Sequence, residues 1–215
     1  METFFSAGIK KSVYCVLWCA VHLLYRPKAF FINPELKKLP RPCILFSKHN
    51  NHVDGSLISV VFGKSQNIHF LAAKDRFEQS RFLSFLLHCL NCLPIDRKGL
   101  DTDWIHKSLK ILKVDNDPVC IFPEGRCGKN GEILEFHSGV TALASLADVP
   151  LLPVYIEGDY KFFFGKSMKI LVGDVFKLDK PKDGLTVEFI NLQTEKMFKE
   201  MIALQQKMSQ ISNIE

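Results

Sequence analysis

Three polar clusters in this sequence combine the residue types that acid–base chemistry and phosphate binding require. The first, KHNNHVD, places a histidine five positions before an aspartate. Across a turn from a strand into a helix, this spacing can bring the Asp54 carboxylate to the His49 imidazole. Asp54 would then fix one ring nitrogen and stabilise the imidazolium, leaving the other nitrogen free to accept a proton. The cluster predicts a general base, although so short a pattern also occurs by chance.

The second and third clusters contain arginines suited to an anion. The segment LPIDRK includes Arg97, whose planar guanidinium has the fork geometry that phosphate oxygens match. The segment FPEGR contains Glu124, Gly125 and Arg126. Gly125 permits close backbone approach, Arg126 supplies further phosphate donors, and Glu124 can position an arginine or a substrate hydroxyl. Read alone, each cluster could equally be a solvated turn.

A metal site would draw on His49, His52 and Asp54. Their spacing does not match zinc patterns, and no Cys or His cluster follows at ligand spacing, so we expect no metal. The seven cysteines are odd in number, scattered and mostly in apolar stretches. Cys89 and Cys92 have the C-x-x-C spacing but lack flanking Gly or Pro and a second pair. We interpret the cysteines as reduced thiols that pack as small apolar side chains, as in cytosolic proteins.

The composition is that of an ordinary globular protein. Of 215 residues, 47% are hydrophobic and 24% charged, which excludes a disordered chain, a collagen-like repeat and a coiled coil. One domain is expected at this length. The 18 Phe against 2 Trp and 4 Tyr give much apolar contact area without a polar handle. Residues 162–164, three consecutive Phe, are a candidate acyl-chain lining or membrane-contact loop; the alternative is the edge of a core strand.

Apolar runs alternate with helical patterns along the chain. Strand-like runs cover 43–47, 68–73, 119–122, 151–156 and 169–172, and helical patterns cover 56–62, 81–90, 104–112, 138–146 and 192–211. The helix over 104–112 has Asp101 or Asp103 available as its N-cap. This alternation predicts an α/β fold with a mostly parallel central sheet flanked by helices. Each polar cluster follows a strand or an apolar run, so we expect one composite site at the carboxyl ends of the strands.

The amino-terminal segment predicts contact with a membrane. Residues 12–25 carry no formal charge, and as a helix they span about 21 Å, less than the ~30 Å hydrocarbon core. Basic residues flank them, and no small-residue cleavage site follows, so a signal peptide is not expected. We expect a helix lying in the membrane interface; a plain buried helix and a short span are the alternatives.

The net positive charge of the chain also lies in this amino-terminal segment. Seven basic and two acidic residues fall within 1–42, so this segment carries the whole excess of five, and the other 173 residues hold 21 of each sign. We divide the chain into an N-terminal amphipathic, membrane-associating helical segment, 1–42, and a neutral catalytic domain, 43–215. We expect a membrane-lipid partner, no nucleic acid, and a position on the cytoplasmic face of a membrane, peripheral or monotopic.

Taken in order, the clusters resemble the glycerolipid acyltransferase family, whose best-known members are the 1-acylglycerol-3-phosphate acyltransferases. The resemblance covers about residues 47–175. His49 and Asp54 match the family's H-x-x-x-x-D pair. The other matching blocks are Ala73-Lys74 with Leu93-Pro94-Ile95-Asp96-Arg97, then Phe122-Pro123-Glu124-Gly125, Val149-Pro150-Leu151-Leu152-Pro153-Val154 and Val172-Gly173-Asp174.

The chain departs from the family pattern at three places. Lys48 stands where the family usually has Asn, and Asn51 where it usually has Ser. After Gly125, the usual Thr-Arg-Ser is replaced by Arg126, Cys127 and Gly128. These departures concern the acceptor more than the type of reaction.

The resemblance implies a membrane-associated O-acyltransferase of phospholipid synthesis. It would move a fatty acyl group from a thioester, acyl-CoA or acyl-carrier protein, to the free hydroxyl of lysophosphatidic acid, with no other cofactor. His49 and Asp54 would be catalytic. Arg97, Glu124, Gly125 and Arg126 would hold the acceptor. Another acceptor (glycerol 3-phosphate, another lysophospholipid or an aminolipid), a non-catalytic lipid-binding module and a thioesterase that uses water are the alternatives.

Overall fold

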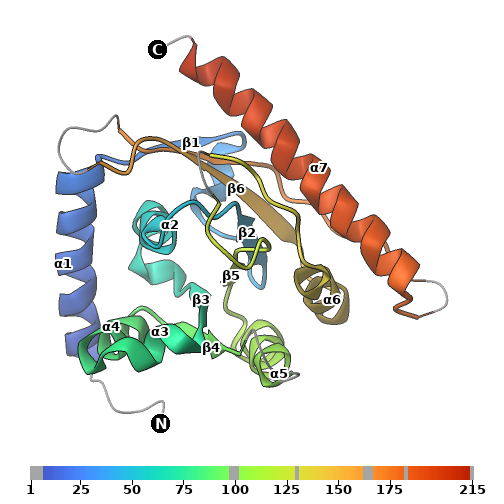
Figure 1. Ribbon diagram of the computed structural model, residues 1–215, viewed down its shortest axis with the longest axis horizontal. Coiled ribbons are helices and arrows are strands. Elements are labelled where there is room, and N and C mark those ends of the chain that lie inside the picture. The colour runs from blue at the N-terminus through green and yellow to red at the C-terminus, as the bar shows by residue number, and fades with distance from the viewer. Residues whose placement is uncertain (1–6, 97–101, 129–130, 162–166, 182–183, 214–215) are drawn as a thin grey trace.

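A seven-stranded sheet forms the centre of the computed structural model, which describes residues 7–96, 102–128, 131–161, 167–181 and 184–213 (Figure 1). The strand order is β1-β7-β6-β2-β5-β3-β4. The strands are β1 (Lys28–Phe31), β2 (Ile44–Ser47), β3 (His69–Ala73), β4 (Cys92–Ile95), β5 (Val119–Ile121), β6 (Leu151–Glu157) and β7 (Lys169–Val172). All neighbours pair in parallel except β6 and β7. The predicted α/β fold with a mostly parallel sheet is confirmed.

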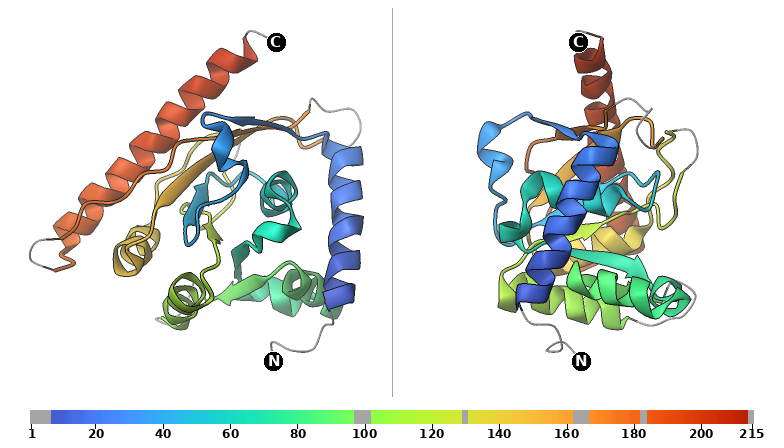
Figure 2. Two further views of the ribbon diagram at one scale, coloured as in Figure 1. Left: turned by 180° about the vertical axis from the view of Figure 1, so that it is seen from behind. Right: turned by 90° about the vertical axis from the view of Figure 1, so that its left-hand side faces the viewer.

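Helices cover both faces of the sheet (Figures 1 and 2). The helices are α1 (Ala7–Tyr25), α2 (Asp54–Phe62), α3 (Lys74–Gln79), α4 (Arg81–Cys89), α5 (Asp103–Lys110) with the π-helical continuation η3 (Ile111–Asp115), α6 (Ser138–Ala147) and α7 (Val187–Ser212). Short 3-10 turns lie at Pro34–Lys37 and Lys64–Gln66. One core lies under α1 and α2, and the other under α5, α6 and α7.

The central strand β2 contributes to both cores, which explains its unbroken apolar sequence. Ile44 and Phe46 pack into the core under α6 and α7, whereas Leu45 packs into the core under α1 and α2. Side chains alternate between the faces of a strand, and both faces of a parallel sheet are covered. The strand ends at the surface edge where the first polar cluster begins, so the core positions that cluster.

Three of the strands and α-helices were not predicted: β1, β4 and α3. The apolar residues of β4 precede the second polar cluster but were not assigned to a strand. β1 pairs in parallel with β7 at the edge of the sheet. Its residues lie within the segment 1–42, where their apolar character reads as a continuation of the preceding helix. The six-residue helix α3 is too short and polar for a helical pattern to appear. At α5, Thr102 is the N-cap and Asp103 lies in the first turn, so the N-cap prediction for Asp103 is wrong; Asp101 lies outside the described residues.

Helix α1 begins at Ala7, five residues before the predicted apolar stretch. Its 19 residues extend about 28 Å, and among the described helices it is the one long and apolar enough to cross a membrane. It is nevertheless docked along its length. Lys10 donates to the Asn91 side chain at 3.3 Å, Tyr14 donates to the Ser59 carbonyl in α2 at 2.9 Å, and Val21 and Tyr25 are buried.

Candidate active site

The first and third polar clusters lie at the carboxyl edge of the sheet, as the alternation of strands and helices predicted. β2 and β5 are parallel neighbours, so the loops that follow them leave the sheet side by side. The first loop leads into α2 and carries His49, and the second carries Glu124, Gly125 and Arg126. A direct backbone bond joins the two loops, since Gly128 N–H donates to the His49 carbonyl at 2.6 Å.

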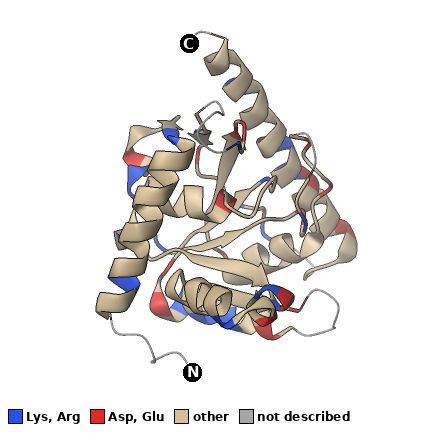
Figure 3. Ribbon diagram, turned by 60° about the vertical axis from the view of Figure 1, so that its left-hand side comes forward, with Lys and Arg blue, Asp and Glu red and all other residues tan. Residues whose placement is uncertain are grey.

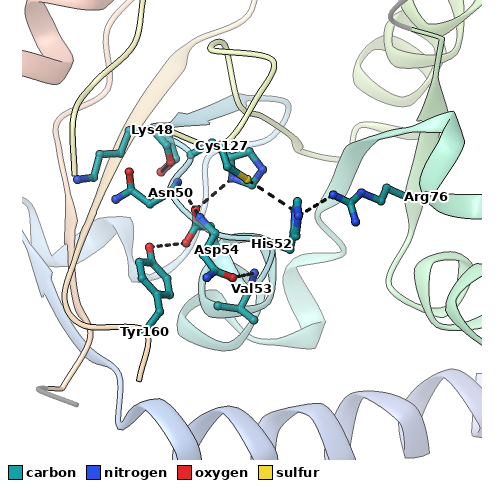
Figure 4. Close-up of polar contacts among 11 residues, drawn as sticks. Lys48, Asn50, His52, Val53, Asp54, Arg76, Cys127 and Tyr160 are labelled. Atoms are coloured by element: carbon teal, nitrogen blue, oxygen red, sulfur yellow. Dashed lines mark hydrogen bonds and ion pairs between the residues drawn. The ribbon is translucent and has the colours of Figure 1, made fainter. Parts of the chain in front are cut away.

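His49 and Asp54 form a hydrogen-bonded pair. The distance between His49 Nδ1 and Asp54 Oδ2 is 3.1 Å (Figure 4). Asp54 is fully buried at the first position of α2, where the helix dipole favours a negative charge, and the His49 side chain is 16% exposed. Because an ionised carboxylate only accepts hydrogen bonds, Nδ1 carries the proton and Nε2 is left with its lone pair. The pair therefore has the arrangement of an oriented general base.

Both oxygens of Asp54 are fully engaged. Besides His49, Oδ2 accepts the backbone N–H groups of Asn50 and Asn51 at 2.8 and 2.9 Å. The Tyr160 hydroxyl donates to Oδ1 at 2.6 Å (Figure 4). Burial, followed by the nearby Asp54 charge, raises the pKa of Tyr160, which keeps this phenol protonated and therefore a donor. Four donors hold the carboxylate in one orientation and stabilise its charge.

An aromatic contact holds the imidazole from its other side. The Phe122 ring stacks on His49 with centroids 4.2 Å apart and an interplanar angle of 23°. Phe122 directly follows β5, so this ring is placed by the same sheet that places His49. With Nδ1 bonded and one face covered, the ring has little freedom to rotate.

Gly125 has a backbone that other residues rarely adopt. Its φ is +64°, and a Cβ built there would lie 2.9 Å from Cδ2 of His137. Both facts require glycine at the turn. The exposed Arg126 follows this turn, and Gly125, Arg126 and His49 all line one cavity.

Glu124 is buried, with 1% of its surface exposed, and it does not line that cavity. Within the described part of the chain, neither carboxylate oxygen has a partner at hydrogen-bond distance and angle. Burial raises its pKa to about 7, against the opposing pull of the His49 and Leu134 backbone N–H groups and the Lys48 ammonium. The structure therefore places Glu124 beneath the site rather than in contact with its open space.

Lys48 is also buried, with its ammonium beside Tyr155. Nζ donates to the Tyr155 hydroxyl at 3.1 Å and to the Gly131 carbonyl at 3.3 Å, and it lies 4.3 Å from the centre of the Tyr155 ring. Burial lowers its pKa, while the carboxylates of Glu157, Asp54 and Glu124 oppose this effect. Lys48 thus places a buried positive charge behind the two acidic side chains of the site.

The cavity beside His49 has a polar mouth and an apolar wall. Its volume is about 590 Å³, within the usual range for a small-molecule site. Arg76, His52 and Arg126 lie at the polar end together with His49. The apolar wall comes from β3, α4 and β4: Phe70, Leu71, Leu83, Leu87, Leu90, Cys92 and Ile95. A more open hollow of about 1130 Å³, beside Arg26, Lys28 and Lys169, contains none of the predicted site residues.

A second polar group joins the site from outside the predicted set. Arg76 of α3 donates to His52 Nε2 at 2.6 Å, and the Cys127 thiol lies 3.7 Å from His52 Nδ1 (Figure 4). His49 and His52 meet edge to face, with ring centroids 6.1 Å apart. His52 therefore connects the base to a cation on one side and a thiol on the other.

The structure thus brings together His49, Asp54, Gly125 and Arg126, and it places Glu124 just below them. Arg97 and residues 162–164 lie outside the described residues. Sequence reasoning missed Tyr160, Arg76 and the apolar wall on α4. The sequence positions of Tyr160 and Arg76 could have indicated a place in the site. Each closely follows a strand that ends at the same edge of the sheet as β2.

The fold and the site together define an enzyme of the α/β class. Its base lies beside a cavity that has basic and apolar side chains in its lining. The family described as Acyltransferase matches residues 17–157, and the chain belongs to this family. The predicted family resemblance is confirmed.

Named relatives agree with this assignment. The chain is 29% identical over 135 residues to "Probable 1-acyl-sn-glycerol-3-phosphate acyltransferase" of Mycoplasma pneumoniae, covering 61% of this chain and 50% of that protein. It is 26% identical over 164 residues to "1-acyl-sn-glycerol-3-phosphate acyltransferase" of Bacillus subtilis, covering 75% and 80%. The crystal structure of the 1-acyl-sn-glycerophosphate (LPA) acyltransferase PlsC from Thermotoga maritima shares the fold, with a TM-score of 0.60, 17% identity and coverage of 95% and 85%.

Proposed function

We propose that this protein transfers a fatty acyl group from a thioester to the free hydroxyl of lysophosphatidic acid, producing phosphatidic acid at a membrane surface. The observation that carries the proposal is the His49–Asp54 pair, whose base opens on a cavity with arginines at its mouth and an apolar wall. The names of the relatives, 1-acyl-sn-glycerol-3-phosphate acyltransferases, indicate the acceptor. The oriented base, the basic mouth and the apolar wall correspond to the hydroxyl, the phosphate and the acyl chain of the reactants.

The reaction needs one proton relay and no acyl-enzyme. His49 Nε2 takes the proton of the acceptor hydroxyl while its oxygen attacks the thioester carbonyl carbon. The C–S bond then breaks, and the leaving thiolate receives the proton from the imidazolium. The Asp54 carboxylate, held by its four donors, stabilises the imidazolium between these steps. Base catalysis of this kind contributes roughly 10²–10⁴-fold to a rate, and positioning contributes more.

The cations at the cavity mouth suit the acceptor phosphate. Arg126 follows the Gly125 turn and Arg76 lies on α3, so the two guanidinium groups approach His49 from different elements. Both keep their charge at any physiological pH and match phosphate oxygens in pairs. We assign the acceptor phosphate to Arg126 and Arg76, together with Arg97 as the family resemblance implies.

The apolar wall suits the acyl chain of the donor. Leu83 and Leu87 of α4 and Phe70 of β3 all line the cavity. Replacing Leu87 by Trp would shorten this space, so we expect Leu87→Trp to shift the preference toward shorter acyl chains in competition assays. Phe82→Trp on the same helix is the matched control, because Phe82 is 70% exposed and does not line the cavity. An equal shift in both variants would remove the acyl chain from this wall.

Helix α1 supports attachment to the membrane. Its inner side is docked on α2 and α4, whereas Val16 and Leu23 are 71% and 67% exposed. Most of its length is uncharged, with basic residues at both ends (Figure 3). Apolar side chains facing outward between cations are typical of a helix lying in the interface of an anionic membrane. The free cysteines and the proposed thioester substrates support a position on the cytoplasmic face of the membrane.

Vesicle binding tests that attachment. We expect Val16→Glu to weaken sedimentation with vesicles containing anionic phospholipid. Val187→Glu on α7 is the matched control, because Val187 is also 71% exposed but lies on the opposite side of the sheet. Equal binding by both variants would argue against α1 as the contact.

The reaction itself is tested by release of free thiol from acyl-CoA with and without lysophosphatidic acid. We expect release to depend on the acceptor, phosphatidic acid to be the product, and His49→Ala to lower the rate at least about 100-fold. His106→Ala is the control, since His106 is exposed on α5 away from the cavity. Equal release without acceptor would identify a hydrolase, and no release with either acyl-CoA or acyl-carrier protein would identify a binding module.

A further inference from the structure

Three potential metal ligands meet beside the cavity: His49 and His52 from the loop between β2 and α2, and Cys127 from the loop after β5. His49, His52 and Cys127 each offer one ligand atom, and these atoms all lie within 4.8 Å of one another. We propose that these residues bind a soft divalent cation, with Zn²⁺ as the best match, and that the bound metal blocks His49. The binding site stands independently of the proposed function, while the blocking effect depends on His49 being the base.

The ligand set and its spacing suit zinc. Two imidazole nitrogens and one thiolate are ligands that Zn²⁺ prefers, and a three-ligand site leaves the fourth position open. Tetrahedral bonds of about 2.0–2.3 Å place ligand atoms about 3.3–3.6 Å apart. The Cys127 sulfur is already 3.7 Å from His52 Nδ1. His52 is exposed and Cys127 is partly exposed, so small side-chain rotations can close the remaining distance.

The surroundings of His49 prepare it as a ligand. Its Nδ1 is bonded to Asp54, so Nε2 is the atom available to a metal. A carboxylate that holds the far nitrogen of a metal-binding histidine fixes the ring and increases its basicity. The Nε2 lone pair that binds the metal is also the one that accepts the hydroxyl proton, so metal binding and base catalysis exclude each other.

Arg76 opposes the metal. A guanidinium only donates hydrogen bonds, so the contact of 2.6 Å makes His52 Nε2 the acceptor and places the ring proton on Nδ1. A metal at Nδ1 requires that proton to move to Nε2 and Arg76 to turn away. The Cys127 thiol loses its proton to solvent, so one proton is released for each metal bound.

Metal titration of the purified, metal-free full chain tests the site. Co²⁺ is the spectroscopic probe, because a thiolate ligand gives a charge-transfer band in the near ultraviolet, and Zn²⁺ is then titrated by calorimetry. We expect one band, one Zn²⁺ per chain and release of one proton. Cys127→Ser should abolish the band, and both Cys127→Ser and His52→Gln should weaken Zn²⁺ binding at least about tenfold.

Cys19→Ser is the matched control, because Cys19 is an exposed thiol on α1, remote from the site. Circular dichroism melts verify that each variant is folded, and the two ligand variants test the same prediction independently. A band that survives in Cys127→Ser, or that disappears in Cys19→Ser, would overturn the site. Full-strength Zn²⁺ binding by either folded ligand variant would do the same.

Arg76→Gln gives a prediction of opposite sign. Removing the donor that holds His52 Nε2 should strengthen Zn²⁺ binding severalfold, whereas weaker or unchanged binding would contradict the role of Arg76. In the acyl-transfer assay, Zn²⁺ should inhibit the wild type, a chelator should reverse this, and Cys127→Ser should resist inhibition. Binding without inhibition would leave the metal site intact and count against His49 as the base.

Discussion

Two buried carboxylates lie next to His49, and their surroundings are opposite. Asp54 follows β2 and has four hydrogen-bond donors on its two oxygens. Glu124 follows β5, is equally buried, and has no partner at hydrogen-bond geometry among the described residues. Burial alone disfavours a charged carboxylate, and hydrogen bonds to the charged form restore it. The comparison teaches that hydrogen-bond donors, rather than depth, decide which acid can stabilise an imidazolium.

Removing the charge of Asp54 should have the largest effect. In Asp54→Asn the side-chain amide can no longer accept from all four donors or stabilise the imidazolium. We expect acyl transfer to fall by about 10²–10⁴-fold, measured as acceptor-dependent thiol release. Asp103→Asn, an exposed carboxylate on α5, is the control. If Asp54→Asn retained most activity, the four donors would not distinguish Asp54 from Glu124 in catalysis.

The second prediction concerns pH and Glu124. With its pKa raised from 4.5 to about 7, folded Glu124 keeps a proton that the unfolded chain releases. Stability from this group is therefore complete below pH 4.5 and is lost as pH rises through 7. The wild-type free energy of unfolding should fall between pH 5 and 8 by about 2.5 kcal/mol more than that of Glu124→Gln. Urea unfolding at both pH values measures this, and parallel pH curves would contradict it.

Tyr160→Phe should make Asp54 more like Glu124 by removing one donor. A hydrogen bond to a charged group contributes about 2 kcal/mol, so we expect that loss of stability and a smaller loss of acyl transfer than in Asp54→Asn. Tyr14→Phe is the matched control, because Tyr14 donates to a neutral carbonyl and should cost about 1 kcal/mol. Thermal or urea unfolding of both variants measures the difference. Equal losses of stability would mean that the hydrogen bond from Tyr160 to the Asp54 carboxylate is no stronger than one to a neutral carbonyl.

The smallest effect should come from the turn that presents the backbone donors. Asn51 Oδ1 accepts the Val53 N–H at 3.3 Å, which closes the turn leading to Asp54. We expect Asn51→Ala to cost about 0.5–1 kcal/mol in urea unfolding, whereas Asn51→Ser keeps an acceptor and should stay close to the wild type. If Ser proved as costly as Ala, the turn would need the amide itself.

Local sequence patterns predicted five of the seven strands, most of the helices and the contact between His49 and Asp54. Contacts between distant residues were beyond them. Tyr160 bonds to a residue 106 positions away, and Cys127 lies beside a histidine 75 positions away, so no spacing rule could connect them. The sequence search for metal ligands required a Cys or His cluster at regular ligand spacing, and the single Cys127 does not meet that rule.

The isolation of Glu124 could not be predicted either, for a different reason. Its FPEG segment specifies a turn, and Gly125 indeed adopts the φ of +64° that glycine allows. Whether a carboxylate in such a turn faces a cavity or the interior depends on the packing of neighbouring loops. Here the backbone near His49 and Leu134 covers it, and this arrangement has no signature in the sequence.

The pairing of β1 with β7 has a consequence for solubility. β7 is flanked by β6 on one side and by β1 on the other, and β1 follows α1 after two residues. A chain shortened to remove α1 and the residues up to 42 would also uncover the hydrogen-bonding groups along β7. Bare strand edges recruit strands from other molecules, so such a truncation would aggregate rather than simply leave the membrane. The amino-terminal segment therefore protects the sheet from self-association as well as carrying the helix.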